Sequence, residues 1–409
     1  MQKTPVAVAV IGAGGYAATH IGFITELEKQ DDAQLSAVVI RDPSKPVYGE
    51  ITAELKQRNV RIYRTASELF AGEQQRTDLV VIPSPIDSHA DLTIKALEAG
   101  FHVLCEKPAA GTTQEAMAMK AASDKTGKVC AIGYHYIFSP GVQEMKKAAV
   151  SGQFGKLVSA RTIGLLPRTR SYYTRNDWAG KINAFGHEIY DSPLQNATGH
   201  YLNTMLYIAG KKPDESARIT SVYGENYRAK PIESADTQYL RIATSTGAIL
   251  HQYATHACSE RVEPLQEFFF ENGKMEWQAG SPVIIRLYGK RGSEYILQKE
   301  IKDTFDTTRH LLYLDIFRAM KENKKPLSTI ENSWQQTFAV EKCFLSSNGV
   351  IQLPSDIMEI VPVSSDENVH DTITVIRDII PLMQELYATG KSFSEKGLSW
   401  AKQGKVISA

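Results

Sequence analysis

Residues 6–15 have the sequence Val-Ala-Val-Ala-Val-Ile-Gly-Ala-Gly-Gly, an apolar run that ends in a glycine-rich turn. A parallel strand that is buried on both faces has such a continuous apolar run. Gly12 permits a tight turn, and Gly14 lets the backbone approach a pyrophosphate, whose charge faces the amides opening the next helix. Ala17 stands at the third glycine position of the G-x-G-x-x-G pattern, where a small side chain suffices. A strand–helix turn without a ligand is the alternative. The segment favours a dinucleotide site contacted by Gly12, Gly14, Gly15 and Tyr16.

Composition and length exclude several classes of protein. The chain has 409 residues, which predicts more than one domain. Lys plus Arg and Asp plus Glu number 46 each, so there is no basic field for nucleic acid or an anionic membrane surface. No apolar run is long enough for a membrane span, and the first strand leaves no room for a signal peptide. The cysteines form no C-x-x-C pair, which favours reduced thiols in the cytoplasm and no metal site.

Two patterns of periodicity divide the chain. Strand-like and helix-like segments alternate up to about residue 130, as in a doubly wound parallel sheet. Beyond residue 156, short alternating segments joined by turns predict an open, mostly antiparallel sheet, followed by helices over 310–321 and 330–346. A further helix is expected over 371–387. We therefore expect an α/β Rossmann domain over 1–135, an α+β substrate and oligomerisation domain over 136–350, and a C-terminal extension over 351–409, packed on the two domains.

Lys107 follows a predicted strand in His102-Val-Leu-Cys-Glu106-Lys107-Pro108. It lies at the sheet edge where doubly wound folds bind ligands, and its ammonium group can stabilise charge developing on a substrate oxygen. Glu106 can orient Lys107. The alternative is a surface ion pair, worth at most about 1 kcal/mol.

His200 ends the motif Asn196-Ala-Thr-Gly-His200, at the start of a predicted helix. Imidazole titrates near neutral pH, so His200 can take up the proton that an alcohol loses when it is oxidised. A helix histidine with only structural hydrogen bonds is the alternative.

Together with Asp78-Leu-Val-Val-Ile-Pro-Ser-Pro85 and the helix after Ser88-His89, these motifs occur in a specific order. In that order the chain resembles the glucose–fructose oxidoreductase/inositol dehydrogenase (Gfo/Idh/MocA) family over roughly residues 5–350. The resemblance implies an NAD(P)-dependent oxidoreductase that moves hydride to or from a secondary carbon of a sugar, sugar derivative or polyol. It also implies a homodimer or homotetramer formed through the open sheet face. Relatives that eliminate or epimerise a transient keto sugar, and relatives that only sense dinucleotide, give two alternatives.

The resemblance also assigns catalytic roles. Lys107 would hold and polarise the reacting oxygen, and His200 would carry the proton. The family has an aspartate one helical turn before this histidine, where this chain has Asn196. Asparagine can orient an imidazole but cannot stabilise imidazolium by charge. Asp191 lies nearby in sequence and is the other candidate for supporting His200.

Residues 168–178 are rich in polar and aromatic side chains, as suits a polyol, whose C–H faces stack and whose hydroxyls take hydrogen bonds. The arginines could equally bind a carboxylate. A solvated loop or an oligomer contact is the alternative. The predicted substrate contacts are Lys107, Tyr134, Tyr136, Arg168, Tyr173, Arg175, Trp178 and His200.

The choice of cofactor depends on the end of the second strand. An acidic residue there usually binds the ribose 2′-hydroxyl of NAD, but Ile40 occupies the expected position and Arg41 follows. An arginine beside a missing acid suits a 2′-phosphate, so NADP is favoured. Asp42 keeps NAD open. The further predicted cofactor contacts are Arg41, Asp42, Pro83, Ser84, Pro85, His89, Glu106 and Lys107.

Overall fold

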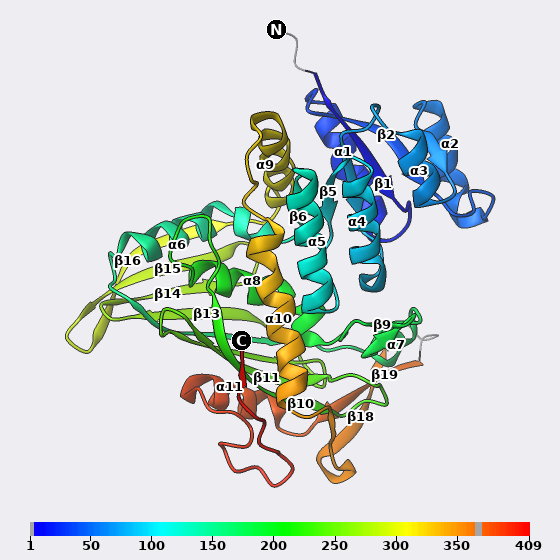
Figure 1. Cartoon of the computed structure of the whole chain (residues 1–409). Coiled ribbons are helices and arrows are strands. Elements are labelled where there is room, and N and C mark those ends of the chain that lie inside the picture. Colours follow the sequence, from blue (N-terminus) through cyan, green and yellow to red (C-terminus); the bar gives the residue numbers. More distant parts are fainter. Residues whose placement is uncertain (1–3, 365–369) are drawn as a thin grey trace. The chain divides into compact units, whose positions relative to one another are not determined.

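The computed structural model describes residues 4–364 and 370–409. The chain forms two compact units (Figure 1). The first comprises Met1–His135 and Asp306–Trp334, and the second comprises Tyr136–Phe305 and Gln335–Ala409. The sequence-based division left residues 306–334 in the second domain. They join the first unit because helix α9 (Thr308–Glu322) packs against helix α1 (Tyr16–Glu28).

The sheet of the first unit is parallel and has six strands in the order β3-β2-β1-β4-β5-β6. This confirms the predicted doubly wound fold. The strand order reverses between β1 and β4, so the carboxyl ends of these strands flank the crevice where such folds bind ligands. The strands are β1 Val6–Ile11, β2 Ala33–Val39, β3 Arg61–Tyr63, β4 Leu79–Ile82, β5 His102–Cys105 and β6 Cys130–Ile132.

The helices of the first unit form where caps and apolar spacing coincide. Before α5, the Thr112 side chain accepts a hydrogen bond from the N–H of Glu115. The Glu115 side chain in turn accepts one from the N–H of Thr112. This capping box starts the helix, and Gly127 ends it with a φ of 67°. Besides α1 and α9, the helices are η1 Pro46–Tyr48, α2 Gly49–Gln57, α3 Ala66–Gly72, η2 Ile86–Ser88, α4 His89–Glu98 and α5 Thr113–Thr126; η3 His135–Phe138 and α10 Ile330–Ser346 cross the unit boundary.

A ten-stranded sheet dominates the second unit, in the order β16-β15-β14-β13-β7-β12-β11-β10-β17, with β20 also paired to β10. Only β7–β12 and β10–β17 are parallel neighbours, so the predicted mostly antiparallel sheet is confirmed. Strand β16 was not predicted because it is exposed along most of its length, which leaves no buried–exposed alternation. The strands are β7 Leu157–Leu165, β10 Ile219–Arg228, β11 Thr237–Thr244, β12 Ile249–Thr255, β13 Val262–Phe270, β14 Gly273–Gln278, β15 Val283–Arg291, β16 Glu294–Asp303, β17 Ile351–Gln352 and β20 Ile407–Ser408.

Different helices cover the two faces of this sheet. Neighbouring residues of a strand point to opposite faces. On β7, Thr162 contacts Met205 of α8, whereas Arg161 donates to the carbonyl of Tyr387 on α11 at 3.0 Å. Thus α8, which carries His200, and α11 lie on opposite faces. The remaining elements are α6 Pro140–Ser151, α7 Arg170–Thr174, β8 Asn183–Ala184, β9 His187–Glu188, η4 Pro193–Ala197, α8 Gly199–Ile208, η5 Ser355–Ile357, β18 Met358–Ser364, β19 His370–Ile376 and α11 Ile379–Thr389.

The prediction of one helix over 371–387 was wrong in its first half. Residues up to Ile376 belong to β19, which pairs with β18, and α11 begins only at Ile379. Ile373 and Val375 are buried while Thr372 and Thr374 are partly exposed, so a period of two over β-branched residues decides for a strand.

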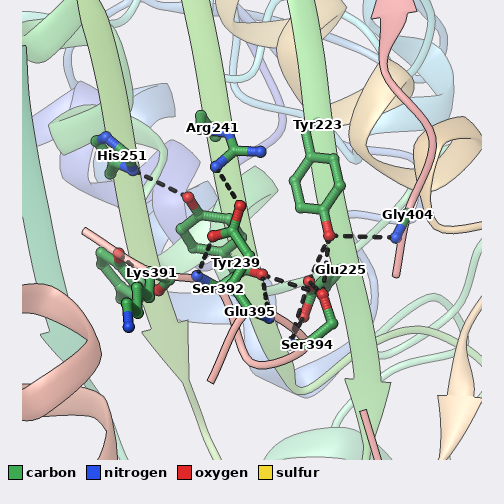
Figure 2. A network of polar contacts seen from close by, with 11 residues as sticks. Tyr223, Glu225, Tyr239, Arg241, His251, Lys391, Ser392, Ser394, Glu395 and Gly404 are labelled. Carbon is green, nitrogen blue, oxygen red and sulfur yellow. Dashed lines mark hydrogen bonds and ion pairs between the residues drawn. The ribbon is translucent and has the colours of Figure 1, made fainter. Parts of the chain in front are cut away.

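Buried polar groups hold the C-terminal segment on the sheet (Figure 2). The fully buried Glu225 of β10 accepts hydrogen bonds from the Tyr223 hydroxyl at 2.6 Å and from Ser394 N at 3.2 Å. Arg241 of β11 pairs with Glu395 at 2.7 Å. The segment after α11 therefore covers part of the sheet face that the sequence predicted to be open.

A histidine in this network makes the fold sensitive to acid. His251 accepts or donates a hydrogen bond with the Tyr239 hydroxyl at 2.9 Å (Figure 2). Burial, with the charges of Arg161 and Arg241, lowers the pKa of His251 to about 4, from its usual value of about 6.5. Between these values the unfolded chain binds a proton that the folded chain excludes, so the free energy of unfolding falls by up to about 1.4 kcal/mol per pH unit on acidification.

We therefore expect His251→Gln to flatten the decline of stability below pH 6.5, measured by urea unfolding at several pH values. The exposed His187 offers the matched control, His187→Gln. Equal slopes for the two variants would contradict this assignment.

Candidate active site

The glycine-rich turn has the geometry of a phosphate cradle. Gly12 and Gly15 have φ values of 110° and 55°, a region that favours glycine. A Cβ on Gly14 would lie 3.3 Å from Cε1 of Tyr48, so a side chain there would crowd the turn. Tyr16 opens α1 directly after this turn, at the strand edge where the sheet order reverses. The turn therefore fits a dinucleotide, whose pyrophosphate the helix amides can bind.

Two of the predicted cofactor contacts follow β2 directly. Ile40 is buried, whereas Arg41 is exposed and Asp42 is partly exposed. Oδ1 of Asp42 accepts hydrogen bonds from the backbone N–H of Ser44 at 3.1 Å and from its hydroxyl. These hydrogen bonds, with the positive charge of Lys45, lower the pKa of the Asp42 carboxyl group. Arg41 and Asp42 are therefore the first residues after β2 that reach the surface.

His89 links the loop after β4 to the loop after β5. Its Nε2 lies 2.8 Å from the carbonyl oxygen of Ser84, and its Nδ1 lies 2.8 Å from that of Pro108. Burial lowers the pKa of this imidazole. The predicted residues Pro83, Ser84 and Pro85 are thereby tied to the segment that carries Lys107.

Glu106 is buried directly before Lys107. Its Oε2 accepts the Lys107 N–H at 2.9 Å, and its Oε1 lies 3.1 Å from Nε2 of His20. Burial alone raises the pKa of Glu106, but the hydrogen bond and charge of His20 and the contacts with Lys107 together lower it. A Cβ on Gly133 would lie 2.5 Å from Oε1 of Glu106, so a side chain there would displace the carboxylate. Lys107 therefore follows a fixed carboxylate.

His200 stands in an aromatic stack within the second unit. Its ring lies 4.2 Å from that of Tyr136 at an interplanar angle of 14°, and the Tyr136 ring also stacks on Phe305 at 3.8 Å. This stacking fixes the plane of the imidazole. By contrast, Tyr134 is fully buried in the hydrophobic core of the first unit.

The two candidates for supporting His200 are joined to each other. The side-chain amide of Asn196 donates to Oδ1 of Asp191 at 3.2 Å, and Gly180 N donates to Oδ2 at 2.7 Å. Asp191 is 3% exposed, so this carboxylate is buried and satisfied by donors. Asn196 lies on η4, three residues before α8 begins at Gly199. Asp191 and Asn196 are therefore hydrogen-bonded partners.

The predicted substrate segment is an array of arginines and aromatic rings. Arg175 lies 3.6 Å from the ring centroid of Tyr172 and 5.1 Å from that of Trp178, and Arg168 lies 4.8 Å from the Tyr172 ring. Such cation–π contacts order side chains that are otherwise flexible. Arg175 is exposed, and Arg168 and Trp178 are partly exposed.

Sequence reasoning missed His256, which supports this segment. Its Nδ1 lies 2.8 Å from the hydroxyl of Tyr173, and burial with nearby positive charge, first that of Arg168, lowers its pKa well below the usual value. The parallel register pairs Thr255 with Leu165, so the residues after both strands meet at one sheet edge. The sequence predicted both β7 and β12, which end just before these residues. It did not show that the two strands pair, so it could not bring His256 to Tyr173.

All four cysteines are buried and free. Within residues 4–364 and 370–409, no group of three or more His, Cys, Asp or Glu side chains is placed to hold a metal ion. In the same ranges, no helix is long and apolar enough to cross a membrane.

Comparison with known proteins agrees with this geometry. Residues 6–134 match the GFO_IDH_MocA family model, described as an oxidoreductase family with an NAD-binding Rossmann fold. The chain is 32% identical over 336 residues to D-glucoside 3-dehydrogenase of Escherichia coli K12. The aligned region covers 78% of this chain and 88% of the relative.

Solved structures share the fold at lower identity. Levoglucosan dehydrogenase, in a complex with NADH and levoglucosan, superposes with a TM-score of 0.71 at 17% identity, over 84% of this chain and 97% of that one. The WlbA dehydrogenase from Bordetella pertussis, in complex with NADH and UDP-GlcNAcA, has a TM-score of 0.68 at 20% identity, over 84% and 97% of the two chains. With the cradle, the Glu106–Lys107 motif and the His200 helix in place, these matches show that the chain belongs to the Gfo/Idh/MocA family of oxidoreductases.

Proposed function

We propose that this protein is an NAD(P)-dependent dehydrogenase that oxidises a secondary ring hydroxyl of a glucoside or a closely related sugar. The observation that carries this substrate class is the match to 88% of D-glucoside 3-dehydrogenase at 32% identity. The arginine–aromatic array at residues 168–178 supports it, because aromatic faces stack on the C–H faces of pyranose rings. The nicotinamide, when bound, supplies the hydride acceptor.

In this mechanism Lys107 binds the oxygen that reacts. Its ammonium group donates a hydrogen bond to the hydroxyl and stabilises the negative charge that develops on the oxygen as hydride leaves. The buried carboxylate of Glu106 holds the Lys107 backbone in place through the 2.9 Å hydrogen bond. Lys107 therefore contributes charge and orientation rather than accepting the proton.

His200 takes up the hydroxyl proton. Stacking on Tyr136 fixes the plane of the ring, and the Asp191–Asn196 pair lies on the segment that leads into α8. Asp191 supplies a negative charge near the position where the resembled family has its aspartate. This offsets the departure at Asn196, because an imidazolium near a buried carboxylate is stabilised by charge. Substrate contacts are assigned to Tyr136, Arg168, Tyr173, Arg175 and Trp178.

The proposed cofactor is NADP rather than NAD. Arg41 is exposed directly after β2, whereas Asp42 already accepts two hydrogen bonds from Ser44. A guanidinium group binds a 2′-phosphate through charge-assisted hydrogen bonds, which are stronger than neutral ones.

We also propose that the protein is a cytoplasmic homo-oligomer. The free, buried cysteines fit a reducing compartment. Residues after α11 cover the sheet over β10, β11 and β12, for example through Tyr253, whose hydroxyl donates to Lys391 O at 3.0 Å. A subunit contact on this outer face would therefore use the strands from β13 to β16.

The experiment is a matrix of NAD and NADP against methyl glucosides, free sugars, sugar acids and inositols. Calorimetry measures nucleotide binding, and absorbance measures reduced nicotinamide. We expect turnover with a glucoside and a ketone on the ring of the product, identified by NMR. Nucleotide binding without turnover of any sugar would contradict the dehydrogenase. Product formation without net reduction of the nucleotide would replace it by redox-neutral elimination or epimerisation.

One variant tests the choice of cofactor. Arg41→Ser is expected to weaken NADP binding by about tenfold or more, because it removes a charge-assisted hydrogen bond worth roughly 1.5–3 kcal/mol. NAD binding should stay within about twofold of the wild type. The matched control is Arg76→Ser, which changes a surface arginine of the same unit. Equal loss of NAD and NADP affinity in Arg41→Ser would contradict the assignment.

A further inference from the structure

We propose that His20 and Tyr313 are positioning residues for the reaction. Together with Glu106 they form a buried hydrogen-bond chain, Tyr313–His20–Glu106, that fixes the main chain of Lys107 and keeps a negative charge beside its ammonium group. The inference rests on the proposed role of Lys107 and adds two residues to it.

The contacts of the chain are continuous. The Tyr313 hydroxyl lies 2.7 Å from Nδ1 of His20, Nε2 of His20 lies 3.1 Å from Oε1 of Glu106, and Oε2 of Glu106 accepts the Lys107 N–H at 2.9 Å. Tyr313 is 0% exposed, His20 2% and Glu106 5%. Water therefore cannot replace these partners cheaply, since a buried polar group that loses its partner pays its full desolvation cost.

The chemistry of the groups sets the direction of each hydrogen bond. Burial, followed by the negative charge of Glu106, raises the pKa of Tyr313 well above its usual value, so the phenol keeps its proton. The Glu106 carboxylate can only accept, so Nε2 of His20 carries the ring proton and Nδ1 accepts from the Tyr313 hydroxyl. From Nε2 the ring donates to the carboxylate of Glu106. Tyr313 thus supports the tautomer that Glu106 needs.

The Glu106 carboxylate is packed closely against a glycine. A Cβ on that residue, Gly133, would lie 2.7 Å from Cδ of Glu106. A charge held in a buried position acts on a neighbouring cation more strongly than it would in water. The positive charge of Lys107 is among the groups that lower the pKa of Glu106, so the coupling works in both directions. The Glu106 carboxylate therefore places a fixed negative charge beside Lys107.

The same chain starts beside the cofactor turn. The ring of Tyr16, the first residue of α1, meets His20 edge-on at 5.3 Å, and Arg309 of α9 donates to the Tyr16 hydroxyl at 2.7 Å. His20 is one helical turn further along α1. The helix that opens at the predicted pyrophosphate site thus also orders the catalytic lysine.

The experiment compares three variants with a matched control in the full-length protein. His20→Phe keeps an aromatic ring but removes both hydrogen bonds, and Tyr313→Phe removes one oxygen. Glu106→Gln removes the charge. The control is His102→Gln, which changes another histidine of the first unit, whose Nδ1 accepts the Val129 N–H at 3.0 Å outside the chain. For each protein we would measure kcat, KM and nucleotide Kd, the pH profile of kcat, and Tm.

We expect His20→Phe to lower kcat by about ten- to a hundredfold, as misplacement of a catalytic group does, with nucleotide Kd within about twofold. The alkaline limb of kcat should move to lower pH in His20→Phe and Glu106→Gln, and less far in Tyr313→Phe. ¹⁵N spectra of histidine-labelled protein should show His20 as the Nε2–H tautomer in the wild type and a changed tautomer signal in Tyr313→Phe.

The proposal is overturned if folded His20→Phe has the kcat and pH profile of His102→Gln, or if kcat and nucleotide affinity fall in parallel. If His20→Phe does not fold, Tyr313→Phe decides by the same criteria. Lys107→Ala tests the role of Lys107 separately from that of the hydrogen-bond chain. Wild-type turnover in Lys107→Ala would overturn the role proposed for Lys107, whereas a large loss of kcat in Lys107→Ala together with wild-type kinetics in His20→Phe would overturn only the hydrogen-bond chain.

Discussion

Lys107→Ala is expected to lower kcat by about 10²–10³-fold, the usual cost of removing one donor that stabilises developing oxyanion charge. The ammonium group is assigned to the reacting oxygen, so its loss should be felt in the chemical step. Nucleotide Kd should stay within about twofold, because the cradle at Gly12–Gly15 is formed by backbone groups. Steady-state kinetics with the best sugar of the panel and calorimetry with both nucleotides measure the two quantities.

Two controls make this result specific. Lys107→Arg keeps the positive charge but changes its shape, and we expect it to remain strongly impaired because a planar guanidinium cannot place a point donor in the same position. Lys125→Ala changes an exposed lysine of α5 and should have wild-type kinetics. A parallel fall of turnover and nucleotide affinity in Lys107→Ala would mean that Lys107 is structural.

His200→Asn is expected to lower kcat by about 10²–10⁴-fold, the contribution typical of a positioned general base. Asparagine keeps a polar side chain on α8 but cannot accept the proton of the alcohol. The wild-type rate of oxidation should rise with pH as the imidazole loses its proton, and the variant should lack this limb. A pH series of kcat in the direction of alcohol oxidation measures both effects, and an unchanged profile in the variant would contradict the role.

The Asp191–Asn196 pair provides a second variant for the same step. Asn196→Asp would restore the residue type of the resembled family, yet it would place a second carboxylate where the amide now donates to Asp191 at 3.2 Å. Like charges at that distance repel, so we expect lower stability and no gain in kcat. Asp191→Asn should lower kcat, since it removes the charge assigned to His200. A faster Asn196→Asp enzyme would show that Asp191 does not serve His200.

Local sequence was sufficient for much of this protein. The apolar run at Val6–Ile11 followed by Gly12 specifies a buried strand and a turn that needs positive φ, both of which depend on adjacent residues. Alternating strands and helices predicted the parallel sheet, and the segments around Lys107 and His200 identified the family. These features depend on side-chain periodicity and backbone sterics, which act over a few residues.

Contacts between distant residues were decided only by the tertiary structure. His20 contacts Glu106, which is 86 positions away in the sequence, and Tyr313, which is 293 positions away. The sequence around His20 looks like that of an ordinary core histidine, so it gives no sign of these contacts. The pairing of β7 with β12 brings His256 to Tyr173. Likewise, Ile373 and Val375 are buried on one face of β19, where the sequence predicted a helix. Burial and hydrogen bonding between remote segments are properties of the packed chain, so the sequence determined which groups are present and the fold determined which of them act together.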